Sequence, residues 1–149
     1  FTLYPELFER DVLIIDIGGM TVDVSYFEGL KLVKYATYPM GMLKLYGEII
    51  QMINSEHATN LELLDAEKVI QGMEIDGLKV NIEDIIRKHA EDILRPIKLE
   101  FPFKTTQKHF IGGGAATLKK YLPGPAREGS IYDNAKAFYK IGVEKYGYN

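Results

Sequence analysis

The sequence has no cysteine among its 149 residues, and no apolar run in it approaches the roughly 18–20 residues that cross a bilayer. The absence of cysteine excludes disulfides and cysteine-ligated metals, and it is compatible with a reducing compartment such as the cytoplasm, where we expect the protein to lie. The first residues also lack the basic and long apolar regions of a signal peptide.

Basic residues are too few to suggest a strongly anionic partner. Lysine and arginine together number 18, against 21 aspartates and glutamates, and the net charge is -3. This charge gives no electrostatic reason for nucleic acid or an anionic membrane to be the main partner. Apolar residues make up 46% of the sequence, which is enough for one globular domain with its own core.

The apolar pattern predicts three strands at the start of the chain. Val12–Ile17 is a continuous apolar run of the kind that is buried on both faces of a sheet. Residues 21–27 and 30–38 alternate apolar and polar side chains, and Glu28-Gly29 is a turn signal between them. Three strands joined by short turns indicate an antiparallel meander.

Helices and one further strand follow the meander. The spacing of apolar residues predicts helices over 42–53, 61–71 and 82–97. Gly72 is expected to end the second helix, Asn81 to cap the third, and Pro96 to kink or end it. The remaining predicted elements are a small hairpin over 73–80, a strand over 108–111, and helices over 115–122 and 131–146. The order indicates an α/β fold in which long helices cover a mixed sheet.

A glycine-rich turn, Asp16-Ile17-Gly18-Gly19-Met20-Thr21-Val22-Asp23, follows the first strand. Gly18 and Gly19 have no side chains, so a phosphate can approach their N–H groups closely, and Thr21 adds a hydroxyl donor. Asp16 is expected to emerge at the tip, where Mg²⁺ would separate its carboxylate from the phosphate. Asp23 is expected to accept hydrogen bonds that hold the turn. The alternative is an ordinary hairpin turn with two solvated or capping acids.

A second glycine turn, Gly112-Gly113-Gly114, lies between the predicted strand 108–111 and the helix 115–122. The free N–H groups at the start of a helix and the bare backbone can seat a base or a ribose. The alternative is a tight packing turn between strand and helix. The two turns together favour a nucleotide, because open α/β sheets bind ligands at the ends of their strands.

These turns resemble those of the actin/Hsp70/sugar-kinase ATPase superfamily. The segment 16–23 resembles its second phosphate-binding hairpin, and the segment 110–118 resembles its adenosine-binding turn. Within the superfamily, the sequence is most similar to the bacterial actin-like ParM/StbA group, which segregates plasmids. Residues 64–70 resemble that group's helix near the ribose, and residues 132–142 resemble its closing helix.

The resemblance implies a role for each residue of the first turn. Asp16 would hold the Mg²⁺ shell and orient the attacking water. Gly18, Gly19 and Thr21 would contact the β and γ phosphates of ATP. Met20 departs from the superfamily pattern, in which a small residue is usual, and its thioether is expected to point away from the phosphate.

The resemblance implies further contacts and a domain organisation. Gly112, Gly113 and Gly114 would face the adenosine, and Glu67 and Lys68 would reach the ribose. The superfamily binds its nucleotide between two similar halves, and no first phosphate hairpin precedes Asp16. We therefore expect residues 1–10 to be a linker or tail from a missing upstream half. Residues 11–149 would form the second actin-like ATPase domain, a ribonuclease H-like α/β half-domain.

The implied function is that of a cytoplasmic ATPase that polymerises into filaments and segregates plasmid or other DNA. The implied partners are the missing first half-domain, further copies in a filament, and an adaptor protein that connects the filament to DNA. The parent protein would hydrolyse ATP, and the isolated chain would be inactive. One alternative is a half-domain of a metabolic kinase of the same fold. The other is a non-enzymatic scaffold of that fold.

Overall fold

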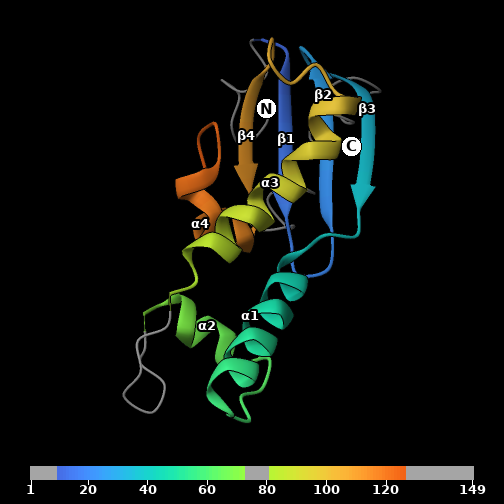
Figure 1. Ribbon diagram of the computed structural model, residues 1–149. Helices are drawn as coiled ribbons and strands as arrows, with labels where there is room; N and C mark the ends of the chain where they lie inside the picture. The colour runs from blue at the N-terminus through green and yellow to red at the C-terminus, as the bar shows by residue number, and fades with distance from the viewer. Residues whose placement is uncertain (1–9, 73–80, 127–149) are drawn as a thin grey trace.

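The computed structural model describes residues 10–72 and 81–126, and the predicted hairpin over 73–80 and helix over 131–146 lie outside them. Four strands form one sheet in the order β3-β2-β1-β4 (Figure 1). β1 (Val12–Ile17) pairs antiparallel with β2 (Val22–Glu28), β2 pairs antiparallel with β3 (Lys31–Tyr38), and β4 (Gln107–Ile111) pairs parallel with β1. The predicted meander and mixed sheet are therefore confirmed.

Four helices accompany the sheet in the described residues. They are α1 (Met42–His57), α2 (Asp65–Ile70), α3 (Glu83–Glu100) and α4 (Gly113–Leu118), and a 3-10 turn over Lys119–Tyr121 follows the last of them. In Figure 1, α3 crosses one face of the sheet, whereas α1 and α2 extend beyond the end at which β1 and β4 terminate. No helix in the described ranges is long and apolar enough to span a membrane.

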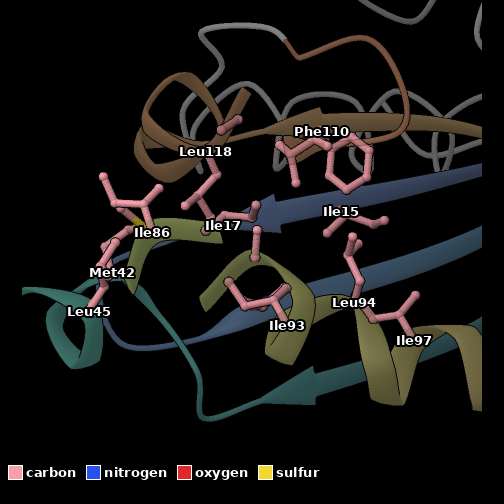
Figure 2. Packing of buried hydrophobic residues seen from close by; sticks show 14 of the residues in the cluster. Ile15, Ile17, Met42, Leu45, Ile86, Ile93, Leu94, Ile97, Phe110 and Leu118 are labelled. Carbon is pink, nitrogen blue, oxygen red and sulfur yellow. The ribbon is translucent and has the colours of Figure 1, made fainter. Parts of the chain in front are cut away.

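The core lies between the sheet and α3. All six residues of β1 are buried: the five apolar ones as the sequence predicts, and Asp16 contrary to its expected place at the tip of the turn. Figure 2 shows Ile15 and Ile17 of this strand directed toward the apolar stripe of α3. The stripe consists of Ile86, Ile93, Leu94 and Ile97, and Phe110 of β4 and Leu118 of α4 complete the cluster. This packing fixes the end of β1 relative to α4.

Of the two outcomes expected at Pro96, a kink or the end of the helix, the second does not occur, since α3 continues to Glu100. A proline has no N–H to give to the preceding turn, but the buried side chains of Ile93 and Ile97 hold the helix against the sheet on both sides of it. The N-cap of the helix is Ile82 rather than Asn81, but the Oδ1 of Asn81 accepts a hydrogen bond from the N–H of Glu83 in the first turn at 3.1 Å.

α2 begins at Asp65 rather than at residue 61, because a hydrogen-bonded turn precedes it. The Asn54 side chain donates to the carbonyl of Leu61 at 3.1 Å and accepts from its N–H at 2.9 Å. The same amide oxygen accepts from the Thr59 hydroxyl at 2.7 Å. The helix ends at Ile70 with Gln71 as its C-cap, and Gly72, the predicted stop, follows directly with φ +87°.

Candidate functional site

The two glycine turns meet at the carboxyl end of β1. Asp16 lies opposite Asp23 in the antiparallel pairing and opposite Ile111 in the parallel pairing. The turn after β1 and the turn after β4 therefore leave the sheet at the same edge, where α1 and α4 also begin (Figure 1). A Cβ atom built on Gly112 would lie only 2.4 Å from Oδ1 of Asp16. The structure thus brings together two motifs that are far apart in the sequence.

Asp16 is buried rather than projecting from the tip of the turn, which corrects the expectation from the sequence. Its side chain is 2% exposed, and neither carboxylate oxygen has a hydrogen-bond partner among the described residues. Burial raises the pKa of Asp16 to about 6, and the nearby charge of Asp23 adds to the increase. A buried carboxylate without hydrogen-bond donors destabilises the folded state. Asp16 therefore lowers the free energy of unfolding of the protein when no ligand is bound.

Asp23 does not hold the turn, contrary to the expectation. Its Oδ1 accepts a hydrogen bond from the hydroxyl of Thr37 on β3 at 2.9 Å, and the two residues are direct partners in the β2–β3 register. The turn is held by main-chain bonds instead. The N–H of Gly18 donates to the carbonyl of Thr21 at 3.0 Å, and the N–H of Met42 in α1 donates to the carbonyl of Gly18 at 2.9 Å.

Gly19 presents the open part of this turn. It is exposed, and its N–H makes no main-chain hydrogen bond to the described residues. Its carbonyl accepts from the N–H of Leu43 at 2.8 Å, which fixes the turn against the start of α1. Met20 is 76% exposed, so its side chain extends into solvent. A ligand at this turn therefore meets the Gly19 N–H more readily than the occupied N–H of Gly18.

The three glycines of the second turn have different roles. Gly112 has φ +90°, a conformation that other residues rarely adopt. A Cβ on Gly114 would lie 2.4 Å from Cγ2 of Ile17 and 2.8 Å from Sδ of Met42. Around Gly113, in contrast, a Cβ would meet nothing within 4 Å. Gly112 and Gly114 are thus required for packing against β1, and Gly113 alone offers an exposed, bare backbone.

Glu67 and Lys68 lie on α2 and are exposed. The hydroxyl of Tyr46 in α1 donates to Oε1 of Glu67 at 3.5 Å, and Lys68 forms an ion pair of 3.9 Å with Asp65. Neither residue is hydrogen-bonded or ion-paired to the glycine turns within the described chain. α2, which carries both residues, lies with α1 beyond the end of the sheet at which the glycine turns lie (Figure 1). Their contact with a ribose stays a prediction.

A metal ion at Asp16 would find no ready-made set of histidine, cysteine or carboxylate ligands among the described residues. In the part of the chain that the structure describes, no group of three or more histidine, cysteine, aspartate or glutamate side chains could hold one. Mg²⁺ suits such a site, because it is commonly bound through one carboxylate, several waters and the phosphates of a substrate. The lone, hydrogen-bond-free carboxylate of Asp16 fits that pattern.

Comparison with known proteins gives matches in structure only. The sequence matches no protein-family model and no curated protein. The archaeal actin homolog Ta0583, in its complex with ADP, matches 92% of this chain over 50% of its own length, with a TM-score of 0.66 and 17% identity. A non-polymerisable quadruple mutant of pCBH ParM matches 93% of this chain over 49% of its own, with a TM-score of 0.73 and 16% identity.

A third match is MreB5 of Spiroplasma citri bound to ADP, with a TM-score of 0.67 and 21% identity. It covers 97% of this chain and 56% of its own. At these low identities the structural matches establish a shared fold, and they confirm the fold that the two glycine turns predicted. The chain therefore has the fold of an actin-like ATPase domain, and it spans about half the length of the solved structures that it matches.

Proposed function

We propose that this chain is the second, nucleotide-binding half of an actin-like ATPase. The observation that carries the proposal is the position of Asp16, which is buried without a hydrogen-bond partner between the two glycine turns. A carboxylate with a purely structural role would have hydrogen-bond donors in this position. A carboxylate that binds a ligand lacks such partners until the ligand is bound. The ADP-bound state of Ta0583 and of MreB5 supports a nucleotide as that ligand.

The phosphates of the nucleotide would lie at the turn after β1. The exposed Gly19 N–H and the Thr21 hydroxyl supply donors there, and Asp16 lies directly beneath the turn. A bound Mg²⁺ would neutralise the repulsion between the Asp16 carboxylate and the phosphates. Asp16, once ionised, would also accept a hydrogen bond from the water that attacks the γ phosphate and so orient that water.

The adenosine would lie against the second turn. Gly113 leaves its backbone open, whereas Gly112 and Gly114 are closed by packing against β1 and α1. Glu67 and Lys68 would contact the ribose from α2. Tyr46 holds the Glu67 carboxylate in place from α1, so the part of the site that α2 contributes depends on the α1–α2 packing.

The parent protein would be a cytoplasmic ATPase that polymerises into filaments. Hydrolysis would act as a timed switch between a closed state that favours the polymer and a looser state after hydrolysis. An adaptor would connect the filament to a plasmid or other DNA, which agrees with the net charge of -3. The likeness of the fold to ParM and MreB5 supports this part of the proposal.

Titration of the 149-residue chain with a fluorescent ATP analogue tests the nucleotide site. We expect saturable but weak binding, with a Kd above about 0.1 mM, because only one of two clamping halves is present. Removal of Mg²⁺ by EDTA should weaken binding further. Hydrolysis should not exceed the rate without protein, because the positioning groups of the other half are absent.

Two outcomes of this titration would contradict the proposal. Robust ATP turnover by the chain would show that it is not one half of a clamp. The absence of any saturable binding at millimolar Mg–ATP would show that the glycine turns are packing turns only. Equal binding of an unrelated polyanion such as tripolyphosphate would argue against a site for the nucleoside.

A further inference from the structure

The connection from β3 into α1 contacts both glycine turns. Gly41 is the N-cap of α1, and Met42 is its first residue. The N–H of Gly41 donates to the carbonyl of Met20 in the first turn at 3.2 Å. The side chain of Met42 packs against Gly114 in the second turn, where a Cβ atom would lie 2.8 Å from its Sδ atom. The start of α1 therefore supports both parts of the candidate site.

Gly41 packs closely against the exposed part of the first turn. A Cβ atom built on Gly41 would lie 2.3 Å from the carbonyl oxygen of Gly19 and 2.6 Å from the carbonyl carbon of Met20. These are main-chain atoms, which cannot move aside as the end of a flexible side chain can. A displacement of Gly41 would therefore displace the main chain of Gly19 and Met20 with it.

The direction of the Gly19 N–H depends on the same start of α1. This N–H and the carbonyl of Gly18 belong to one planar trans peptide group, so they point in opposite directions. The carbonyl of Gly18 accepts a hydrogen bond from the N–H of Met42 at 2.9 Å. The Gly19 N–H, which is the proposed phosphate donor, is therefore directed away from α1 and is held in that direction by Met42.

The start of α1 lacks a capping side chain among the described residues. Gly41 makes no side-chain cap, and the first turn of α1 contains no acidic residue. Instead, the carbonyls of Gly18 and Gly19 accept from the N–H groups of Met42 and Leu43, in the place of a cap. The turn and the start of the helix thus hold each other, and their joint position depends on a contact with the rest of the fold.

His89 of α3 provides such a contact. Its side chain is 2% exposed, and its imidazole is hydrogen-bonded to the main chain of Gly41. The N–H of Gly41 is already given to Met20, so the carbonyl of Gly41 accepts this bond. Burial lowers the pKa of His89, so the ring is neutral at neutral pH and has one N–H to donate. Nε2 has no hydrogen-bond partner among the described residues, which assigns the N–H to Nδ1.

We propose that His89 is a positioning residue for the phosphates of the nucleotide, because it holds the carbonyl of Gly41 and so fixes the start of α1 and the direction of the Gly19 N–H. His89 is buried and acts through Gly41, without touching the nucleotide. A leucine would fill the same buried position without the cost of burying a polar ring, which favours a specific role for the imidazole. The inference rests on the nucleotide site proposed above and adds to it a residue of α3.

Amide hydrogen exchange of the chain without nucleotide tests the contact. His89→Leu removes the N–H donor and keeps an apolar side chain of similar size, whereas His89→Asn keeps a donor near the position of Nδ1. In the leucine variant, we expect the amides of Met42 and Leu43 to exchange about tenfold faster relative to those of β1, because one hydrogen bond to the start of α1 is lost. The asparagine variant should restore most of the protection.

Three results of this experiment would overturn the inference. The first is unchanged exchange at Met42 and Leu43 in the leucine variant. The second is an equal increase in the amides of β1, which would indicate a general loss of stability. The third is equal exchange in the leucine and asparagine variants, since only one of them keeps the N–H donor.

NMR titration with Mg–ADP measures the effect on the ligand. The leucine variant should bind Mg–ADP several-fold more weakly than the unaltered chain, because the phosphate donor is no longer held in one direction, and the asparagine variant should bind nearly as well. Equal affinity of the leucine variant and the unaltered chain would also overturn the inference. Absence of binding by the unaltered chain would instead refute the nucleotide site, whereas the exchange rates would still decide whether His89 holds the start of α1.

Discussion

Replacement of Asp16 by asparagine is expected to stabilise the chain against urea by about 2 kcal/mol near neutral pH and to remove the Mg²⁺ dependence of nucleotide binding. The carboxylate is buried, has no hydrogen-bond donor and lies opposite Asp23. Its pKa of about 6, compared with an ordinary 3.8, corresponds to about 3 kcal/mol of destabilisation when the group is ionised. The asparagine amide, which also lacks partners, offsets part of the gain.

The pH dependence has a definite sign. The folded chain binds the Asp16 proton more tightly than the unfolded chain, so this group contributes stability that is complete below pH 3.8 and is lost as the pH rises through about 6. Asp16→Asn should therefore stabilise the chain at neutral pH and change little near pH 4. Urea unfolding at the two pH values measures the difference. Loss of stability at neutral pH, or a Mg²⁺ effect on nucleotide binding that survives the substitution, would contradict a ligand-binding role for Asp16.

Gly112→Ala is expected to destabilise the chain by about 3–5 kcal/mol, through backbone strain and overpacking together. Gly112 has φ +90°, and a methyl group there would lie 2.4 Å from Oδ1 of Asp16 and 2.6 Å from the carbonyl oxygen of Ile17. The atoms of β1 cannot move away, because the strand is buried along its whole length. A loss of this size is a large fraction of the stability of an ordinary domain.

Gly113→Ala is the matched control for that substitution. Its backbone is open and helical, so the stability should be unchanged or raised by up to about 1 kcal/mol. Its affinity for Mg–ATP should nevertheless fall several-fold, because the methyl group covers the bare backbone on which the adenosine is proposed to lie. Chemical denaturation and nucleotide titration of both variants measure the two effects. Equal stability of the two variants would refute the division between packing glycines and an open glycine.

The strands were predictable because their signals are local. Val12–Ile17 is apolar at every position except Asp16, and the structure gives β1 the same bounds. The start of α2 was not predictable, because the Asn54 side chain fixes the preceding turn from within α1. The continuation of α3 past Pro96 similarly depends on burial of its neighbours against the sheet. Tertiary packing outweighs the local preference in both places.

The candidate site was predictable as two motifs but not as a geometry. The glycine spacing indicated a phosphate turn and a nucleoside turn, and the parallel pairing of β1 with β4 brings them together. The sequence could not show that Gly112 packs against Asp16, or that the Thr37 hydroxyl donates a hydrogen bond to the Asp23 carboxylate. Both contacts depend on strand register. Nor could it distinguish Gly113 from its neighbours, because only the packed structure shows which glycine stays open.

The central claim is that nucleotide binds where the two glycine turns meet, and amide NMR spectra of the isotope-labelled chain during titration with Mg–ADP test it most directly. We predict that the largest shifts occur at Gly19 and Gly113, the two open positions, and that they no longer depend on Mg²⁺ when Asp16 is replaced by asparagine. The amides of residues 98–108, at the opposite end of the sheet, should not move. Shifts confined to those residues, or none at Gly19 and Gly113 at saturating Mg–ADP, would contradict the proposed site.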